Sequence, residues 1–245
     1  MRTLAGPMLA DENLPQAMSE VRLSTQAEKK IVAIGGGKGG IGKSLLASSL
    51  GIELARRGQR VILVDLDLGG ANLHTALGIA HPEETLYDFV GRRVETLEEL
   101  AVETGIENLR LISGSLDAIG AANPLHQQKL RLMRAIQGLN AEIILLDLGA
   151  GSHFNVLDFF LLADQGIVTL VPEPTAVENA YRFVKAAFFR RLKAVEAVYH
   201  LQEYLADVMK SKRPMSPAEL LRSVSERDPD AGRRLEEEMR AFRPF

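Results

Sequence analysis

The stretch GGGKGGIGKS, residues 35–44, combines a glycine-rich backbone with two basic side chains. Glycine loses more conformational entropy on folding than any other residue, so such a cluster needs a backbone reason. Gly37 to Ser44 fits the spacing G-x-x-x-x-G-K-S, in which successive main-chain N–H groups surround phosphate oxygens. In that arrangement Lys43 neutralises phosphate charge and the Ser44 hydroxyl binds Mg²⁺. The sequence therefore predicts a phosphate-binding loop.

The same glycines also fit a second motif. Gly35, Gly37 and Gly40 match G-x-G-x-x-G, the dinucleotide fingerprint, whose acidic partner follows about 20 residues further on. Asp65 lies somewhat further along the chain than that, but spacing alone does not exclude it as the acidic partner. A dinucleotide site has no use for the lysine and serine that end the loop. We therefore favour the phosphate loop, and a nicotinamide-dependent oxidoreductase is the weaker alternative.

Three aspartates follow apolar runs and could serve a metal ion or a water molecule. Asp65 and Asp67 end the run RVILVDLD, and Asp147 ends EIILLD. The carboxyl ends of parallel strands meet at one edge of a sheet, where α/β folds bind ligands. Aspartate also favours turns and caps, which leaves a solvated strand end as the structural alternative for Asp65 and Asp67. Near a phosphate loop, the metal-side role is the better interpretation of Asp147.

A parallel sheet is needed to bring these side chains together. Apolar runs of buried-strand length occur at residues 31–34, 60–67, 109–113, 142–148 and 166–171. Helical patterns separate them at residues 43–57, 125–139 and 155–162. Alternating strands and helices predict an α/β fold with a doubly wound, mostly parallel sheet.

The C-terminal part has a different, wholly helical pattern. From Ala176 apolar residues recur every three or four positions, and Ser216-Pro217 and Asp228-Pro229 are helix-start signals. Residues 1–28 lack periodicity, which is typical of a flexible tail. We expect that tail, a P-loop domain over residues 29–192, and a helical segment over 193–245.

Composition limits the remaining chemistry. The chain has 245 residues, 46% of them apolar, and a formal net charge of −3, so no global basic field attracts nucleic acid. It has no cysteine, which excludes disulfides, thiolate metal sites and a cysteine nucleophile. The five histidines show no metal-ligand spacing. No apolar run approaches the roughly 20 residues of a membrane-spanning helix. We therefore expect a soluble, cytoplasmic protein.

The loop KGGIGKS resembles the deviant Walker A loop of the MinD/ParA class of P-loop ATPases, which have the SIMIBI type of P-loop fold. Lys38 is the signature lysine of that resemblance. The resemblance implies that Lys38 reaches the partner's nucleotide in an ATP-sandwiched homodimer. It also implies that Asp67 orients the attacking water, and that Asp65 supports the magnesium shell.

Two later segments extend the resemblance. The segment DLGAG, from Asp147 to Gly151, resembles the second switch of the class, although much of the class has proline where Gly149 stands. The segment VPEPTAVENAY resembles the flagellar-number regulator branch, the FlhG or MinD-like flagellar ATPases. Members of the class continue with further strands, one of which bears an adenine-reading asparagine; no such strands are visible in this sequence.

The resemblance implies a complete set of site residues. We expect Lys38, Lys43 and Asp67 to be catalytic, and Ser44, Asp65 and Asp147 to serve Mg²⁺. We expect ATP to be bound by the following residues: Gly37, Lys38, Gly39, Gly40, Ile41, Gly42, Lys43, Ser44, Leu45, Pro172 and Pro174. For the two prolines, a turn that ends the fifth strand is an equally good interpretation.

The implied function is a slow, partner-stimulated Mg-ATPase that dimerises with ATP and acts as a spatial regulator. The regulated process would be flagellar number and placement or the choice of a division site; plasmid, chromosome or cargo partitioning is the alternative. Expected partners are a second copy of the chain and a regulatory protein, such as a flagellar GTPase or a site-marking protein. Peripheral contact at the inner face of the cell membrane is compatible with this function. DNA is a weaker expectation, because the basic run FFRRLK is more typical of a solvated helix face.

Overall fold

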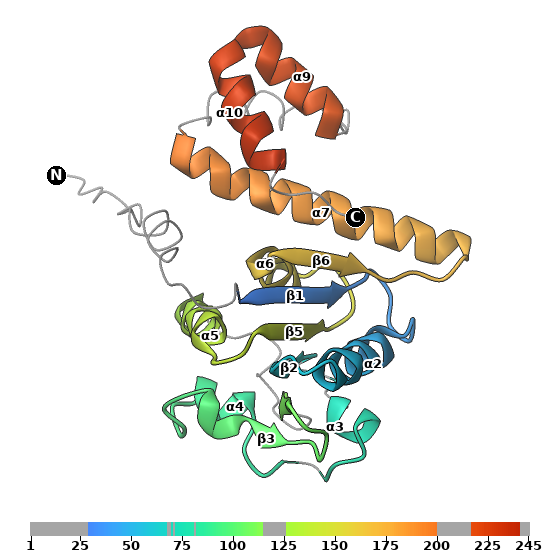
Figure 1. The fold of residues 1–245 in the computed structure, drawn as a ribbon. Helices are drawn as coiled ribbons and strands as arrows, with labels where there is room; N and C mark the ends of the chain where they lie inside the picture. The colour runs from blue at the N-terminus through green and yellow to red at the C-terminus, as the bar shows by residue number, and fades with distance from the viewer. Residues whose placement is uncertain are drawn as a thin grey trace, which may run out of the picture.

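The computed structural model describes residues 29–67, 70, 72–80, 82–114, 126–199 and 217–240. A six-stranded sheet with the order β3-β4-β2-β5-β1-β6 forms its centre (Figure 1). All neighbouring strands are parallel except β3, which is antiparallel to β4. The strands are β1 (Lys30–Gly35), β2 (Val61–Leu66), β3 (Val102–Glu103), β4 (Leu109–Ile112), β5 (Ile143–Leu148) and β6 (Gln165–Val168).

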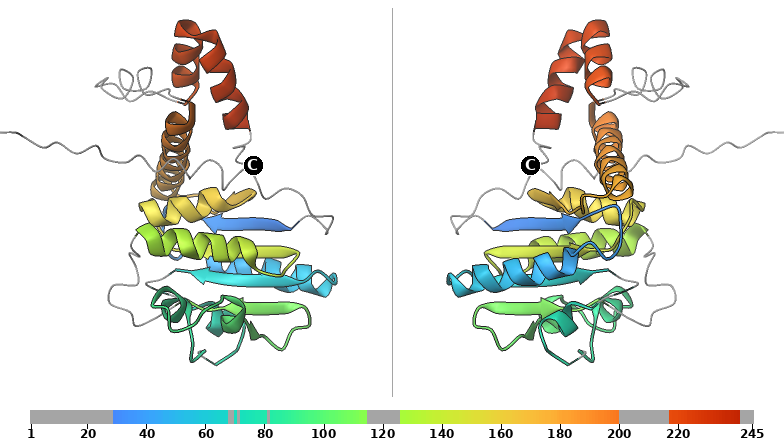
Figure 2. Two further views of the ribbon diagram at one scale, coloured as in Figure 1. Left: turned by 90° about the vertical axis from the view of Figure 1, so that its left-hand side faces the viewer. Right: turned by 90° about the vertical axis from the view of Figure 1, so that its right-hand side faces the viewer.

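Helices cover both faces of this sheet (Figure 2). Helices α2 and α3 share a core with one face, and α4, α5, α6 and α7 share a core with the other. A sheet covered on both faces confirms the predicted doubly wound arrangement. The helices are α2 (Lys43–Arg56), α3 (Leu73–Ala76), α4 (Leu86–Val90), the 3₁₀ turn η1 (Glu98–Leu100), α5 (His126–Gly138), α6 (Phe154–Leu162), α7 (Pro174–Tyr199), α9 (Pro217–Arg227) and α10 (Pro229–Arg240).

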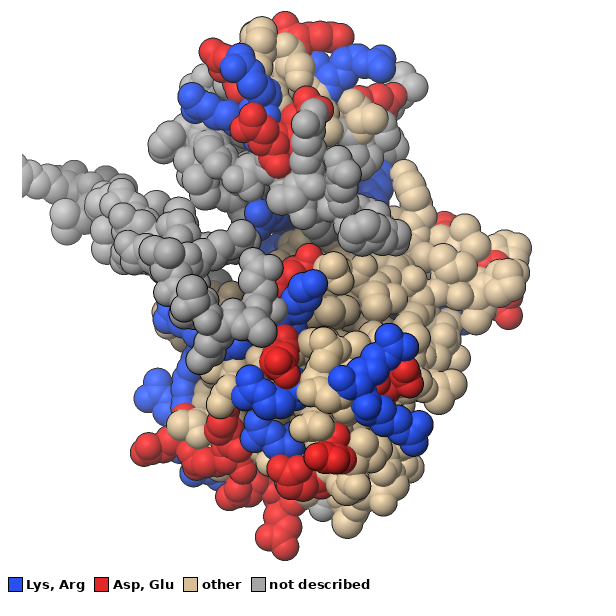
Figure 3. All heavy atoms as spheres, viewed as in Figure 1, with Lys and Arg blue, Asp and Glu red and all other residues tan. Residues whose placement is uncertain are grey.

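Charged side chains of both signs are mixed on the face shown in Figure 3. Surface near the carboxyl ends of the strands, at the right of that view, is largely uncharged. Exposed large apolar side chains lie on elements at this end: Leu45, Leu46, Leu170, Val177 and Tyr181.

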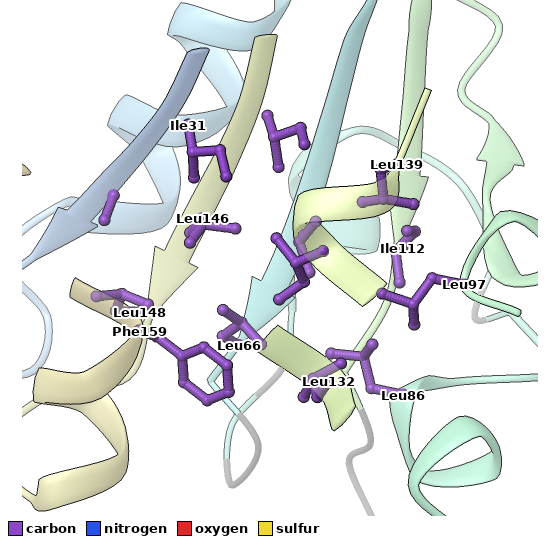
Figure 4. Close-up of a cluster of buried hydrophobic side chains, with 14 of the residues drawn as sticks. Ile31, Leu66, Leu86, Leu97, Ile112, Leu132, Leu139, Leu146, Leu148 and Phe159 are labelled. Carbon is purple, nitrogen blue, oxygen red and sulfur yellow. The ribbon is translucent and has the colours of Figure 1, made fainter. Parts of the chain in front are cut away.

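Strand residues alternate between two buried cores. Ile31 and Ala33 of β1 belong to one core, while Val32 and Ile34 belong to the other. The larger core, shown in Figure 4, contains side chains such as Leu146 of β5, Leu132 of α5 and Phe159 of α6. Burying both sets of side chains fixes the register of the strands, because a slip of one residue would exchange the two faces.

The C-terminal helices form a separate layer beyond the sheet (Figures 1 and 2). Helix α7 is 26 residues long. Its N-terminal and central part contributes Phe183 and Ala187 to the core on one face of the sheet, and the part that follows supplies Phe188 and Leu192 to a third core. That third core also contains Leu220, Val224, Ala231 and Leu235 of α9 and α10. Helix α7 therefore joins the sheet to the hairpin formed by α9 and α10.

Most of the predicted elements are confirmed, with small changes at their ends. The five predicted strands correspond to β1, β2, β4, β5 and β6, and the predicted helices correspond to α2, α5, α6, α7, α9 and α10. Residues 68–103 contain short elements that the sequence did not predict, namely α3, α4, η1 and β3. The predicted tail, residues 1–28, lies outside the described residues. The division into a P-loop domain and a C-terminal segment stays a prediction, and α7 runs across the predicted boundary.

Candidate nucleotide-binding site

The glycine-rich loop connects the end of β1 to the start of α2, as the sequence predicts. Gly40 and Gly42 have φ values of 71° and 88°, in the left-handed region that side chains other than glycine rarely adopt. Gly42 is the N-cap of α2 and provides no side-chain cap. The first N–H groups of α2 therefore receive no side-chain acceptor from their N-cap residue, and N–H groups at a helix start are suited to bind an anion.

The first glycines of the loop are needed for close packing. A Cβ atom on Gly37 would lie 2.3 Å from the main-chain oxygen of Asn179 in α7. A Cβ atom on Gly36 would lie 2.8 Å from the side chain of Ile41 and 3.0 Å from the main-chain oxygen of Thr169. These contacts require glycine whether or not a phosphate is bound. The loop is thus held against α7 by backbone packing.

The two lysines of the loop have different surroundings. Lys43 is buried, and its Nζ donates a hydrogen bond of 3.4 Å to the main-chain oxygen of Lys38. Lys38 is exposed, and its Nζ lies 3.1 Å from Oε2 of Glu173, which precedes α7. Lys43 therefore points back into the loop, whereas Lys38 crosses to the segment between β6 and α7.

Asp147 lies at the end of β5 beside the loop and is almost fully buried. Within the described part of the chain, neither of its carboxylate oxygens has a hydrogen-bond partner. Burial raises the pKa of Asp147 to about 6; the nearby Ser44 hydroxyl and Lys43 ammonium oppose that rise, and Asp67 adds to it. The Ser44 hydroxyl is thus close enough to influence the carboxylate, although no hydrogen bond of good geometry joins them. Buried polar groups without a hydrogen-bond partner are rare, and a bound ion is one of the partners that can satisfy them.

Asp65 lies on β2, the strand next to β5, and is paired in register with Asp147. It is buried, and its oxygens accept hydrogen bonds from the main-chain N–H groups of Leu73 at 3.0 Å and Asp67 at 3.1 Å. Burial raises the pKa of Asp65 to about 7; the two N–H groups oppose this shift, and the charges of Asp147 and Asp67 add to it. Asp65 therefore fixes the backbone that follows β2 and holds Asp67 at the same edge.

Asp67 meets the segment after β5 across this edge. A Cβ atom on Gly149 would lie 3.1 Å from Oδ1 of Asp67 and 3.4 Å from its Cγ. A side chain at position 149 would therefore crowd the Asp67 carboxylate. This contact gives a physical reason for glycine at a position where the related class often has proline.

The donor set near the loop fits Mg²⁺ bound together with phosphate. Mg²⁺ is usually held by one or two carboxylates, phosphate oxygens and waters, and does not need a cage made of protein. Asp147 offers an unsatisfied carboxylate, and Ser44 a neighbouring hydroxyl. Among the described residues, no group of three or more His, Cys, Asp or Glu side chains is arranged to hold a metal ion.

Most of the predicted site residues lie together at one edge of the sheet; the exceptions are Pro172, Pro174 and Leu45. The loop from Gly37 to Ser44, Asp65, Asp67 and Asp147 all lie at the carboxyl ends of β1, β2 and β5. Pro172 lies between β6 and α7, and Pro174 is the first residue of α7; both are exposed. Leu45, in the first turn of α2, is 70% exposed. The role of these three residues in holding the base and ribose stays a prediction.

Two contacts at the site were missed by the sequence reasoning. Glu173 binds Lys38, and Thr169 donates its N–H to the main-chain oxygen of Gly35 at 3.0 Å. Each contact joins residues more than a hundred positions apart, so local spacing carries no signal for it. The motif PEPT drew attention to this segment, but not to its acidic residue.

Comparisons with known proteins agree with this geometry. A family model described as "AAA domain" matches residues 29–195. The antiactivator FleN of Pseudomonas aeruginosa is 30% identical over 158 residues, which are 64% of this chain and 55% of FleN. The septum site-determining protein MinD of Helicobacter pylori is 29% identical over 177 residues, 70% of this chain and 65% of that protein. The chain thus spans less than two thirds of the length of these relatives.

Solved structures show the same fold. MinD from Pyrococcus horikoshii, complexed with Mg-ADP, is 27% identical, covers 63% of each chain and gives a TM-score of 0.57. A plasmid partition protein from Borrelia burgdorferi is 20% identical with a TM-score of 0.56, covering 88% of this chain and 98% of its own; this likeness concerns the fold alone. The predicted resemblance to the MinD/ParA class and the predicted P-loop fold are confirmed.

Proposed function

Because the chain belongs to the AAA domain family, we propose that it is a magnesium-dependent ATPase that dimerises when ATP is bound. The dimer is the active form of a spatial regulator, and hydrolysis ends its active period. A partner protein stimulates this slow hydrolysis. The related MinD structure from Pyrococcus horikoshii is complexed with Mg-ADP, which supports a magnesium-bound adenine nucleotide as the ligand of this chain.

The observation that carries this proposal is the unsatisfied Asp147 carboxylate beside the phosphate loop. A buried carboxylate without a partner is costly, and the nearby Ser44 and Lys43 only partly offset its burial. Mg²⁺ supplies positive charge that neutralises the phosphate oxygens and this carboxylate together. An oxidoreductase that binds a dinucleotide would leave Asp147 and Lys43 without a role.

Each residue of the site then has a distinct task. The N–H groups of the loop and of the first turn of α2 bind phosphate oxygens. Lys43, whose Nζ donates to the main-chain oxygen of Lys38, would neutralise phosphate charge. Asp67 accepts a hydrogen bond from the attacking water and orients it, because a carboxylate is a suitable acceptor for a water proton. Lys38 reaches the nucleotide of the second copy.

The regulated process is proposed from the names of the relatives. FleN is an antiactivator, and the MinD proteins determine septum sites. The flagellar resemblance of the segment VPEPTAVENAY favours a flagellar regulator over a division-site regulator. A neighbouring cluster of flagellar genes in the genome would support this choice, whereas a neighbouring gene for a centromere-binding partner would favour partitioning.

Phosphate release by the full chain tests the enzymatic part. We expect slow, magnesium-dependent release from the wild type and none from Lys43→Ala. Asp67→Ala is expected to bind ATP, release no phosphate and accumulate as a dimer in light scattering. Equal release from all three proteins would exclude the proposed activity.

Calorimetric titration with ATP, GTP and NADH, each with Mg²⁺, tests the ligand. Binding of ATP that is lost in Lys43→Ala supports the phosphate loop as its site. Binding of NADH that is unchanged in Lys43→Ala would instead identify a dinucleotide site.

A further inference from the structure

Lys38 forms an ion pair within its own chain. Its Nζ lies 3.1 Å from Oε2 of Glu173, in the segment between β6 and α7. We propose that Glu173 is a positioning residue that holds Lys38 inside the monomer and thereby limits formation of the ATP-bound dimer. This inference rests on the proposed function, in which Lys38 must reach the nucleotide of a second copy.

Lys38 is anchored on the main-chain side. The neighbouring Gly37 packs against the backbone of Asn179, close enough that a Cβ atom would lie 2.3 Å from the Asn179 oxygen. The main-chain oxygen of Lys38 accepts the hydrogen bond from Lys43. Little freedom is therefore left for the backbone that carries the Lys38 side chain.

Glu173 is anchored as well. Its N–H donates to the main-chain oxygen of Val171 at 2.7 Å, which closes a tight turn, and its own main-chain oxygen accepts the N–H of Val177 at 3.0 Å at the start of α7. Because both backbones are fixed, the pair loses less conformational entropy on forming than an ordinary surface ion pair. The side chains are 43% and 59% exposed, so water and salt still compete with the pair.

Lys38 carries one positive charge, and two anions compete for it. In the monomer the anion is the Glu173 carboxylate, and in the proposed dimer it is the triphosphate of the second copy. The Lys43 hydrogen bond to the Lys38 main-chain oxygen is 3.4 Å long, so a phosphate at the loop would compete with it for the Lys43 ammonium and weaken one of the anchors. Glu173 thus disfavours dimerisation, because Lys38 leaves the ion pair only when a second, ATP-bound copy of the chain offers a stronger anion.

Two arms test the inference on the full chain. In the first, a zero-length carbodiimide joins carboxylates to amines that are in direct contact. We expect a crosslink between Lys38 and Glu173 without nucleotide, and isotope-labelled and unlabelled chains mixed together should show that it forms within one chain. Its absence, or a crosslink found only between two chains, would overturn the proposal.

In the second arm, light scattering measures the dimer against protein concentration with Mg²⁺ and a non-hydrolysable ATP analogue. We expect Glu173→Gln to lower the midpoint, the protein concentration at which half of the chain is dimeric, by about two- to fivefold for each Lys38–Glu173 ion pair that is lost. Glu173→Asp, which keeps the charge, should return the midpoint toward the wild-type value. Raising the salt concentration should narrow the difference between wild type and Glu173→Gln.

Glu178→Gln is the matched control. Glu178 lies one turn further on, its side chain is also 59% exposed, and it pairs with Arg182 at 2.5 Å. Its replacement should leave the midpoint unchanged. A higher midpoint for Glu173→Gln, or an equal shift for Glu178→Gln, would contradict the role of Glu173. A wild-type chain that stays monomeric with the analogue would refute the proposed function, while the crosslink still decides whether the pair exists.

Discussion

Asp147 and Asp158 lie on consecutive elements and have opposite surroundings. Asp147 ends β5, and within the described residues its carboxylate oxygens have no hydrogen-bond partner. Asp158 lies in α6 and accepts hydrogen bonds from Lys129 of α5 and from Arg190 of α7, whose Nε and Nη2 lie at 2.7 Å and 3.0 Å. Burial raises the pKa of Asp147 to about 6, whereas at Asp158 the effect of burial is outweighed by Arg190 and Lys129, which lower its pKa.

This difference separates a structural charge from one that awaits a ligand. Asp158 links three helices that cover one face of the sheet, so its donors come from the fold itself. The surroundings of Asp147 provide Ser44 and Lys43 but no complete set of donors. Buried polar groups are usually satisfied within the protein, and exceptions occur where a bound ion or substrate completes the site. The two carboxylates should therefore respond to the same substitution in opposite ways.

Asp158→Asn should have the largest effect, and on stability. It leaves the buried Lys129 ammonium, which is 5% exposed, and the Arg190 guanidinium without their counterion. Breaking one partner of a buried ion pair costs about 3–5 kcal/mol. Urea unfolding should show this loss, while nucleotide affinity per folded molecule should stay close to that of the wild type. A stability loss below about 1 kcal/mol would mean that the cluster is not the link between these helices.

Asp147→Asn should sharpen the contrast, because it removes a charge that the fold does not satisfy. We expect phosphate release to fall about 100- to 1000-fold, the usual cost of losing one electrostatic group at a reacting centre. The free energy of unfolding should be unchanged or higher, because burial disfavours the ionised carboxylate. Parallel urea titrations of the two variants make the comparison. A destabilisation of Asp147→Asn equal to that of Asp158→Asn would contradict the distinction.

The contrast also shows what the sequence could predict. The aspartates at strand ends and the loop from Gly37 to Ser44 were predicted, because parallel strands bring their carboxyl ends to one edge. The ion pair of Lys38 with Glu173 and the cluster around Asp158 were not. Those contacts join elements whose relative placement depends on how α7 crosses the sheet, and this crossing is decided by tertiary packing.

The short elements between β2 and β4 were not predicted for a related reason. Helix α3, Leu73–Ala76, has a single turn, and β3, Val102–Glu103, has two residues, so neither produces a periodic pattern. The start of α3 is nevertheless part of the site, because the N–H of Leu73 binds Asp65. What the sequence could not reveal was therefore the backbone that holds the predicted aspartates in place.

Gly232→Ala tests whether the hairpin of α9 and α10 belongs to the structural part of this comparison. A Cβ atom on Gly232 would lie 2.3 Å from Oγ and 2.6 Å from Cα of Ser225 in α9, so alanine forces the helices apart. Overpacking of this kind costs about 1–3 kcal/mol, although alanine otherwise favours helix over glycine. Hydrogen exchange should show faster opening of α9 and α10, with phosphate release unchanged.

Gly138→Ala, at the end of α5, is the control for this substitution, since nothing lies within 4 Å of the added Cβ atom. It should be neutral or slightly stabilising. If Gly232→Ala reduced phosphate release as strongly as Asp147→Asn, the hairpin would belong to the site and the division drawn between the two regions would be wrong.

The pH dependence of the free energy of unfolding gives the smallest predicted effect. Its sign distinguishes Asp65 and Asp147 from Asp158. Burial raises the pKa of Asp65 to about 7 and that of Asp147 to about 6, so between about pH 4 and pH 7 the folded, nucleotide-free chain binds more protons than the unfolded chain. The contribution of these groups to the free energy of unfolding therefore decreases as the pH rises through this window. Asp158, whose pKa is lowered, contributes stability that is lost only as the pH falls below the ordinary range of aspartate.

Binding of Mg-ATP should show the reverse trend, because Mg²⁺ requires the ionised form of Asp147. We expect affinity to fall by about tenfold from pH 7 to pH 5, since one proton must leave the carboxyl group when the ion binds. Calorimetry in two buffers with different ionisation enthalpies measures that proton release directly. In Asp147→Asn the residual binding should release no such proton near pH 6. If wild type and Asp147→Asn released equal numbers of protons, Asp147 would not be the group that the ion completes, and its unsatisfied state would need another cause.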